Sequence, residues 1–207
     1  MHFDPAVTMR PPPLQHNPYT ALVMPRPIGW VSTMGKDGIV NLAPYSFFNA
    51  VAGDPPCVMF CANGRNRHDG GEKDSLRNVR EVPEFVWNLC TYDLREQMNA
   101  TSEHFPRGVD EMAKAGLAPA PSIKVRPPRV ARAKVALECE VYRIVDLPPG
   151  KDGITNNMVI GRVVCVHVAD EVISEGKIDV LKLKPMARLG YFDYAVIDDF
   201  ITLLRPD

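Results

Sequence analysis

The sequence predicts a mainly β fold, a barrel with a few peripheral α-helices. Short runs rich in β-branched and aromatic residues recur along the chain and are bounded by turn residues. Twenty prolines, several in pairs, fall between these runs, and stiff loops joining strands accommodate them better than a helical bundle. The 207 residues show no internal repeat or linker and suit one domain. We expect that domain over residues 19–207, after an extended N-terminal arm at residues 1–18.

The first half of the chain carries the clearest strand signals. Tyr19–Met24 predicts a short first strand, and Ile28–Thr33 predicts a second. Gly35–Gly38 contains an Asp-Gly pair, which is typical of a tight turn between antiparallel strands, and the strand pattern resumes after it. Cys57–Ala62 is a largely apolar run that predicts a buried strand.

Helical signals are confined to the middle of the chain. Asp74 or Ser75 is expected to cap a short helix, a D-x-x-E pattern at Asp93 predicts the start of another, and Gly116 is expected to end a third that begins near Asp110. Strands then return at Ala133–Val145 and at Met158–Val168. The second of these is so apolar that we expect burial on both faces.

Composition excludes several classes of function. The formal charge is −1 and the pI is about 6.5, so no basic field draws the chain to nucleic acid or acidic lipid. No apolar run approaches the ~20 residues of a membrane span, which leaves the cytoplasm as the default location. The five cysteines lie in apolar runs without the spacing of a metal site, as expected of buried thiols in a reducing compartment.

Two short segments combine aromatic rings with hydroxyl and amide groups. These residues are Trp30, Ser32, Thr33, Tyr45, Ser46, Phe47, Phe48 and Asn49. The combination suits a planar ligand with a polar rim, which needs apolar area for its rings and a few placed hydrogen bonds. The alternative is ordinary: the rings belong to the core, and the hydroxyls satisfy backbone groups at strand ends.

Several motifs, in a fixed order, resemble the flavin reductase-like family with the FMN-binding split-barrel fold, which includes flavoredoxin-like proteins. They are PRPIGWVST, DGxxNLAPYSFF, DPP, KDSLRN at Lys73–Asn78, EFVWNL, AGLAPAPS, IGRVV and RLGYFDY, and they span about Tyr19 to Pro206. The resemblance implies a Greek-key split barrel, an FMN cofactor and a homodimer. It also implies an oxidoreductase in which NADH or NADPH reduces the flavin.

The resemblance also implies which residues hold FMN. WVST and APYSFFN would meet the flavin with backbone and hydroxyl groups, its ring lying against Trp30 and Tyr45–Phe48. Lys73, Asp74 and Ser75 would bind the phosphate with a cation, a hydroxyl and the free N–H groups of a helix start. Ser75 stands where threonine is commoner in the family, and keeps the hydroxyl. Arg26, and the pair Arg65 and Arg67, are alternative phosphate contacts.

The expected activity follows from this cofactor. No GxGxxG fingerprint is present, so a nicotinamide would bind transiently over the flavin, with His104 as a possible neighbour in its loop. Hydride transfer between two aligned rings needs no protein acid or base, so we expect no catalytic residue and no metal. Electrons would pass to free flavin, a monooxygenase partner or another acceptor. The rival hypotheses are a non-enzymatic flavin- or haem-binding carrier and an interaction domain without cofactor.

Overall fold

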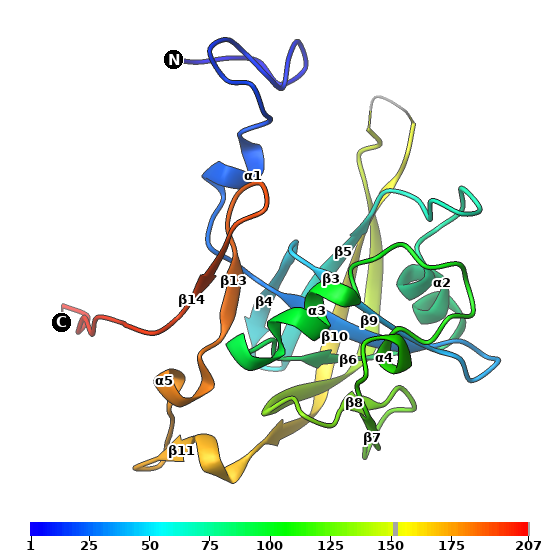
Figure 1. Ribbon diagram of the computed structural model, residues 1–207, viewed down its shortest axis with the longest axis vertical. Helices are drawn as coiled ribbons and strands as arrows, with labels where there is room; N and C mark the ends of the chain where they lie inside the picture. Colours follow the sequence, from blue (N-terminus) through cyan, green and yellow to red (C-terminus); the bar gives the residue numbers. More distant parts are fainter. Residues whose placement is uncertain (151–152, 207) are drawn as a thin grey trace.

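The computed structural model describes residues 1–150 and 153–206, and its centre is one antiparallel sheet of seven strands (Figure 1). The strands follow one another across the sheet in the order β3 (Val40–Tyr45), β2 (Gly29–Met34), β6 (Glu84–Asn88), β9 (Val135–Leu147), β10 (Asn156–Val168), β5 (Pro56–Asn63) and β4 (Phe48–Gly53).

Smaller elements surround this sheet. A three-stranded sheet has the order β1 (Arg26–Pro27), β13 (Met186–Arg188), β14 (Tyr194–Val196), and two strand pairs are β7 (Pro119–Ala120) with β8 (Arg129–Val130) and β11 (Ile173–Ser174) with β12 (Lys177–Ile178). The α-helices are α1 (Tyr19–Leu22), α2 (Asp74–Glu81), α3 (Arg95–Ala100), α4 (Glu111–Lys114) and α5 (Val180–Leu183), with 3₁₀ turns η1 (Tyr92–Leu94) and η2 (Asp170–Val172).

The sheet closes on itself at one corner. β3 and β4 lie at opposite ends of the strand order, yet only Ser46 and Phe47 separate them in the chain. The two edges of the sheet must therefore meet, which makes a barrel. The Cys61 N–H donates to the Phe47 carbonyl at 2.9 Å beside this corner. The predicted class, a mainly β split barrel with peripheral helices, is confirmed, and we call residues 45–47 the closure corner.

The predicted hairpin of β2 and β3 is also confirmed. Its two strands pair from Gly29 opposite Tyr45 to Met34 opposite Val40. Between them, the Gly38 N–H donates to the Gly35 carbonyl at 3.1 Å, and Gly38 has φ 80°, a conformation that glycine adopts without steric cost. The Asp-Gly pair thus sets the register that carries Tyr45 to the closure corner.

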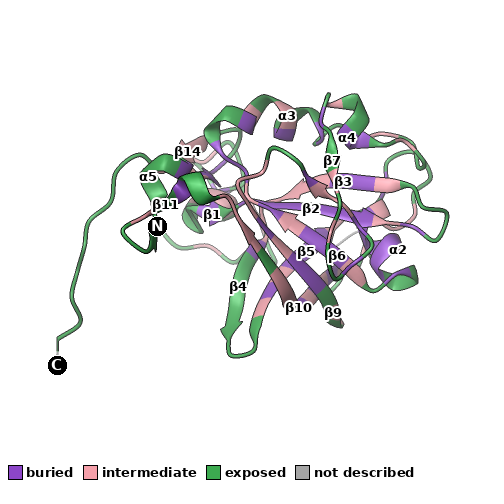
Figure 2. Ribbon diagram, turned by 90° about the horizontal axis from the view of Figure 1, so that it is seen from below, coloured by how far each residue is buried: buried purple, intermediate pink, exposed green. Residues whose placement is uncertain are grey.

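Aromatic and branched side chains from several strands fill the barrel. The buried residues are concentrated on its central strands (Figure 2). Phe60 and Phe85 meet edge to face, with ring centroids 5.2 Å apart. Gly161 on β10 lies under Phe85, and a Cβ there would come within 2.4 Å of the ring. Burial along β10 alternates in its first half and is partial beyond it, so the prediction that both faces are buried is wrong. One face packs inward, as is usual for an antiparallel strand.

The structure corrects three predicted element boundaries. Tyr19–Met24 is not a strand: Ala21 and Leu22 donate backbone hydrogen bonds to Pro18, which starts α1. The N-cap of α2 is Lys73 rather than Asp74 or Ser75, without a side-chain cap. Asp93 does not cap a helix, because its carboxylate accepts a 2.5 Å hydrogen bond from the Thr91 hydroxyl.

The third predicted helix is confirmed as α4. The Asp110 side chain caps it by accepting the Ala113 N–H at 3.1 Å, and Gly116 follows its end with φ 67°. Residues 1–18 contain neither helix nor strand, and both terminal segments extend away from the barrel (Figure 1). No helix in the described part of the chain is long and apolar enough to cross a membrane.

Candidate functional site

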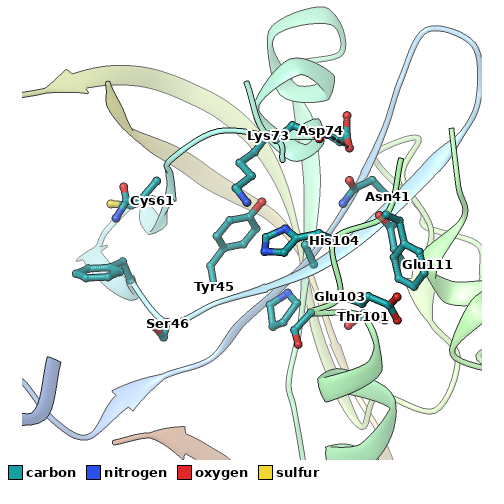
Figure 3. Close-up of a pocket in the computed structure, with 17 residues that line it drawn as sticks. Asn41, Tyr45, Ser46, Cys61, Lys73, Asp74, Thr101, Glu103, His104 and Glu111 are labelled. Atoms are coloured by element: carbon teal, nitrogen blue, oxygen red, sulfur yellow. Dashed lines mark hydrogen bonds between the residues drawn. The ribbon is translucent and has the colours of Figure 1, made fainter. Parts of the chain in front are cut away.

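A cleft of about 290 Å³ opens beside the closure corner (Figure 3). Its walls come from β3 and the corner, the end of β5, the start of α2, and the segment between α3 and α4. The lining residues are Asn41, Ala43, Pro44, Tyr45, Ser46, Phe47, Cys61, Asn63, Asn66, Lys73, Asp74, Thr101, Ser102, Glu103, His104, Phe105 and Glu111. The cleft therefore lies where the barrel closes, and four separate parts of the sequence contribute to it.

The closure corner supplies the aromatic wall. Tyr45 packs against Phe60 of the core, with ring centroids 5.0 Å apart, and its phenol is hydrogen-bonded to Ser75. Burial is the main reason that the pKa of Tyr45 lies above its usual range, which keeps the phenol neutral. Phe47 lies on the same wall, stacked at 6.5 Å on Tyr19. The corner thus offers neutral, flat and partly apolar surface.

Lys73 supplies a cation on the opposite wall. It occupies the N-cap position of α2, and its side chain reaches toward Tyr45 (Figure 3). Burial lowers the pKa of Lys73, and the neighbouring Arg67 lowers it further, while Asp74 acts in the opposite direction. A half-buried ammonium at the start of an eight-residue helix is suited to an anion, because the helix N–H groups there also point outward.

The negative charge of Asp74 is balanced by two side chains other than Lys73, namely Asn66 and Arg107. One carboxylate oxygen accepts from Asn66 Nδ2 at 3.1 Å, and the other accepts from Arg107 Nη1 at 3.3 Å. Asp74 therefore serves to hold the loop and the α3–α4 segment against α2. Its pairing with Arg107 reduces the repulsion that an anion at Lys73 would meet.

His104 lies beside basic residues at this end of the cleft, and they favour its neutral imidazole form. Its pKa is lowered first by burial and then by the charges of Lys73, Arg67 and His68. His68 is joined to the same segment by a 2.8 Å hydrogen bond between its Nε2 and the His104 carbonyl. The charge of Arg67 lowers the pKa of Lys73, so these two cations repel one another, and an anion bound between them would relieve that repulsion.

Glu111 is a buried carboxyl group at the cleft that we did not predict from the sequence. Its Oε2 accepts the Leu42 N–H of β3 at 2.9 Å. Burial raises the pKa of Glu111 to about 7, and the nearby Asp74 and Asp110 contribute to the rise. Nothing in the sequence marks it, since an acidic residue in the first turn of a helix is ordinary.

Two asparagines were also missed. Asn41 is buried on β3 and donates through Nδ2 to the Ser75 hydroxyl at 3.1 Å. Asn63 ends β5, and its Oδ1 is buried without a hydrogen-bond partner among the described residues. A buried acceptor is costly when unpaired, so Asn63 identifies a position for a ligand donor. The available sequence signal was a polar residue ending an apolar strand.

Five of the predicted contacts line the cleft: Tyr45, Ser46, Phe47, Lys73 and Asp74. Ser75 lies beneath them, hydrogen-bonded to Asn41 and Tyr45. The structure thus brings the closure corner and the KDS segment together, although about 25 residues of chain separate them.

Four other predicted contacts lie in the core instead of on the cleft. Trp30 is fully buried and donates through Nε1 to the Thr101 hydroxyl at 2.9 Å. Ser32 donates to the Pro128 carbonyl at 2.6 Å, and Thr33 accepts from Asn78 at 3.1 Å. Phe48 stacks on Trp87 at 5.2 Å. Trp30, Ser32 and Thr33 bond to other parts of the chain because β2 is an inner strand, flanked by β3 and β6, and Phe48 at the start of β4 packs into the core.

The remaining predicted residues lie elsewhere. Arg26 is held by the carbonyls of Thr20, Val23 and Leu189, the last at 2.7 Å. Asn49 lines an apolar groove beside β4, and Arg65 donates to the Gly70 carbonyl at the wall of another cavity. Among the alternative phosphate contacts, Arg67 alone is close enough to influence Lys73.

A separate polar cluster joins β9 and β10. Glu138, Cys165 and His167 bring potential metal-ligand atoms within 4.8 Å of one another. The Glu138 carboxylate, however, already accepts the N–H groups of Ile123, Lys124 and Val125 and lies 2.5 Å from His167 Nε2. The cluster therefore anchors the loop at residues 123–125 to the sheet.

The cleft combines features that a flavin mononucleotide requires. Its aromatic wall provides area for a planar ring, the unpaired Asn63 oxygen can accept from a ligand donor, and Lys73 with the α2 N-terminus can hold a phosphate. The residues present thus fit the group.

The chain belongs to the flavin reductase-like family, whose domain model matches residues 21–194. A relative from Aquifex aeolicus, itself functionally uncharacterised, is 41% identical over 170 residues, 82% of this chain and 83% of its own. The structure of nitrilotriacetate monooxygenase component B from Bacillus cereus superposes with a TM-score of 0.86, at 30% identity, and covers 98% of both chains.

Two further solved structures share the fold. The 2-nitrobenzoate 2-nitroreductase NbaA of Pseudomonas fluorescens gives a TM-score of 0.78 at 32% identity, with 91% of this chain and 88% of NbaA covered. Flavoredoxin of Desulfovibrio vulgaris gives a TM-score of 0.73 at 17% identity, with 87% of this chain and 91% of flavoredoxin covered. At this identity the likeness is one of fold alone. The family and the fold expected from the motifs are therefore confirmed, and a flavin-binding oxidoreductase role is supported.

Proposed function

We propose that this protein binds FMN in the cleft at the closure corner and reduces it with NADH or NADPH. The single observation that carries the proposal is the placement of Lys73, at the start of α2, across from the aromatic closure corner. The Lys73 ammonium borders the hydroxyl end of Tyr45, so a phosphate at Lys73 and a ring along the closure corner can belong to one compact ligand.

The proposed contacts follow from the lining of the cleft. Lys73 and the first N–H groups of α2 hold the phosphate, and Arg67 strengthens the local positive potential. Tyr45 and Phe47 flank the ring, Ser46 offers its hydroxyl and backbone, and Asn63 Oδ1 accepts a ligand hydrogen bond. Trp30, Ser32, Thr33 and Phe48 support this site from the core.

The flavin, when bound, supplies the two-electron chemistry of the reaction. The chain contributes binding, orientation and a partly desolvated setting: Ser75 and Asn41 fix the Tyr45 ring, and Glu111 holds β3 through the Leu42 N–H. In balance, the proposed reaction would consume NAD(P)H, one solvent proton and an oxidised acceptor, and would give NAD(P)⁺ and the two-electron-reduced acceptor. The proposed final acceptor is free flavin, a monooxygenase partner or another small acceptor.

We further propose that the protein acts as a homodimer. The apolar groove beside the edge strand β4 and the exposed residues of the C-terminal segment, which include Phe200 and Leu204, support this assembly. Sedimentation at several protein concentrations tests it. A monomer that still binds flavin would overturn this part of the proposal.

The proposed activity is tested by two measurements on purified protein. The absorbance spectrum, followed by release and chromatography of the chromophore, should identify FMN, or FMN should bind more tightly than FAD when supplied. NADH and NADPH oxidation is then followed with FMN and an acceptor. Flavin binding without nicotinamide oxidation would favour the electron-carrier alternative, and a colourless protein that binds no flavin would refute the proposal.

A further inference from the structure

A second chamber of about 540 Å³ adjoins the cleft. The two cavities share Pro44, Tyr45, Ser46, Ser102 and His104, so a ligand in one lies next to a ligand in the other. The rest of the chamber is lined by Ile28, Met98, Asn99, Arg188, Phe192 and Tyr194. This volume is ample for a small organic molecule.

Arg188 gives the chamber a cation with unused hydrogen-bonding capacity. The guanidinium lies over the Tyr194 ring at 4.5 Å and donates to the Tyr194 hydroxyl and the Tyr191 carbonyl. A guanidinium has five N–H groups, so these two bonds leave donors free. In the described ranges, 1–150 and 153–206, no carboxylate lies within 4.0 Å of Arg188.

A second arginine reinforces the positive charge. Arg26 on β1 stands directly opposite Arg188 on β13, and its own bonds go to backbone carbonyls. Burial and the charge of Arg188 both lower the pKa of Arg26, a sign that the two cations repel one another. Among the described residues, no acidic side chain lines the chamber. An anion at Arg188 would relieve this repulsion.

We propose that the second chamber binds a ring-bearing organic anion as the second reactant, and that Arg188 is its anion contact. Tyr194, Phe192 and Met98 provide the apolar and aromatic surface for the ring. The anion can be the phosphate of a nicotinamide donor or the carboxylate of an aromatic acceptor. The inference rests on the proposed function for its second-reactant role, while the binding itself can be measured without turnover.

The test compares two probes that share a ring and differ in charge. Benzoate and benzamide are titrated by calorimetry into FMN-loaded protein, and the benzoate affinity is expected to exceed that of benzamide by at least about tenfold. Arg188→Ala should abolish this preference, and Arg188→Lys should keep most of it. Arg143→Ala, at an exposed β9 position outside both cavities, is the matched charge control and should change nothing.

Two further variants and one kinetic measurement complete the test. Tyr194→Phe removes a partner of Arg188 but keeps the charge, so benzoate should still be preferred; this guards against a purely structural effect of Arg188→Ala. If Arg188→Ala raises the KM for NADH without lowering kcat, the natural anion is the nicotinamide phosphate. If KM is unchanged while benzoate binding is lost, the anion is an aromatic carboxylate.

The proposal is overturned if benzoate and benzamide bind equally to the unmodified protein. It is also overturned if Arg188→Ala alters neither benzoate affinity nor KM. Failure of the proposed reductase function is a distinct result, since it would abolish nicotinamide oxidation in every variant, while benzoate and benzamide can still be compared by calorimetry on flavin-free protein.

Discussion

Strand β2 and the closure corner have similar compositions and different roles. Both combine aromatic rings with hydroxyl groups. In β2 these residues are Trp30, Ser32 and Thr33, and in the closure corner they are Tyr45, Ser46 and Phe47. The hydroxyls and the indole of β2 are bonded to other parts of the chain, and their side chains are fully buried. The corner residues line the cleft.

The difference comes from position in the sheet. β2 is an inner strand, flanked by β3 and β6, so its side chains are covered on both faces by the core and by surrounding loops. The corner lies where β3 ends and β4 begins, at the seam of the barrel, and its three residues line the cleft. Residue type therefore identifies a polar aromatic segment, while topology decides whether it faces a ligand or the core.

The largest expected effect is on stability, at Trp30. Trp30→Ala removes a fully buried indole and its bond to Thr101, and should lower the free energy of unfolding by about 3–5 kcal/mol. Phe47→Ala, at the partly exposed corner, should cost far less stability while weakening FMN binding. Chemical denaturation of both variants checks this contrast. Equal losses of stability would show that the corner is also core.

A pH-dependent effect is expected at Glu111. Its pKa rises from 4.5 unfolded to about 7 folded, so the folded state holds the proton more tightly, and stability falls as pH rises between these values. At ~1.4 kcal/mol per unit, ionised Glu111 costs at most about 3 kcal/mol above pH 7.

Glu111→Gln should remove this cost and keep an acceptor for the Leu42 N–H. Denaturant unfolding at pH 5 and pH 8 measures the free energy of unfolding of both proteins. The stability of the variant relative to the unmodified protein should be greater at pH 8 than at pH 5. A stability difference that is the same at both pH values would contradict the raised pKa.

Lys73 tests the anion end of the cleft. Lys73→Ala removes a charge-assisted hydrogen bond of about 1.5–3 kcal/mol, a roughly 10- to 150-fold loss of FMN affinity. Riboflavin lacks the phosphate and should bind almost equally well to both proteins. Fluorescence titration at matched ionic strength measures both. Parallel losses for the two ligands would mean that Lys73 shapes the cleft without binding phosphate.

The smallest expected effect compares two serines. Ser46→Ala at the corner should leave stability within about 0.5 kcal/mol and reduce FMN affinity only a few-fold. Ser32→Ala in β2 should cost about 1 kcal/mol of stability, because its hydroxyl donates to Pro128 and lies 3.4 Å from Asn88 Nδ2. Thermal unfolding and flavin titration of the pair separate the two roles. A larger loss of FMN affinity in Ser32→Ala would reverse the assignment.

Much of the fold could be predicted because its signals are local. The Asp-Gly turn at Gly38, the apolar run of β5 and the short helix α4 ended by Gly116 each depend on a few adjacent residues, and all are found. The errors have two causes, one in the adjacent residue and one in tertiary packing. Tyr19–Met24 has strand-like residues, but Pro18 accepts the bonds that begin a helix, and β10 is covered on one face only.

The site was predicted only in part for a similar reason. Tyr45 and Lys73 were recognisable from motif and chemistry, whereas Asn63 and Glu111 reach the cleft through closure of the barrel and packing of α4 against β3. Arg188 enters the second chamber because β13 pairs with β1. Such convergence is set by tertiary structure, and a single sequence carries no local mark of it.

The crystal structure of the protein with FMN tests the central claim most directly. The account predicts the phosphate within hydrogen-bond distance of Lys73 Nζ and the first N–H groups of α2, with the ring against Tyr45 and Phe47. Trp30, Ser32 and Thr33 should keep their present partners. A ring bound against the side chains of β2, or a phosphate bound at Arg26, would contradict it.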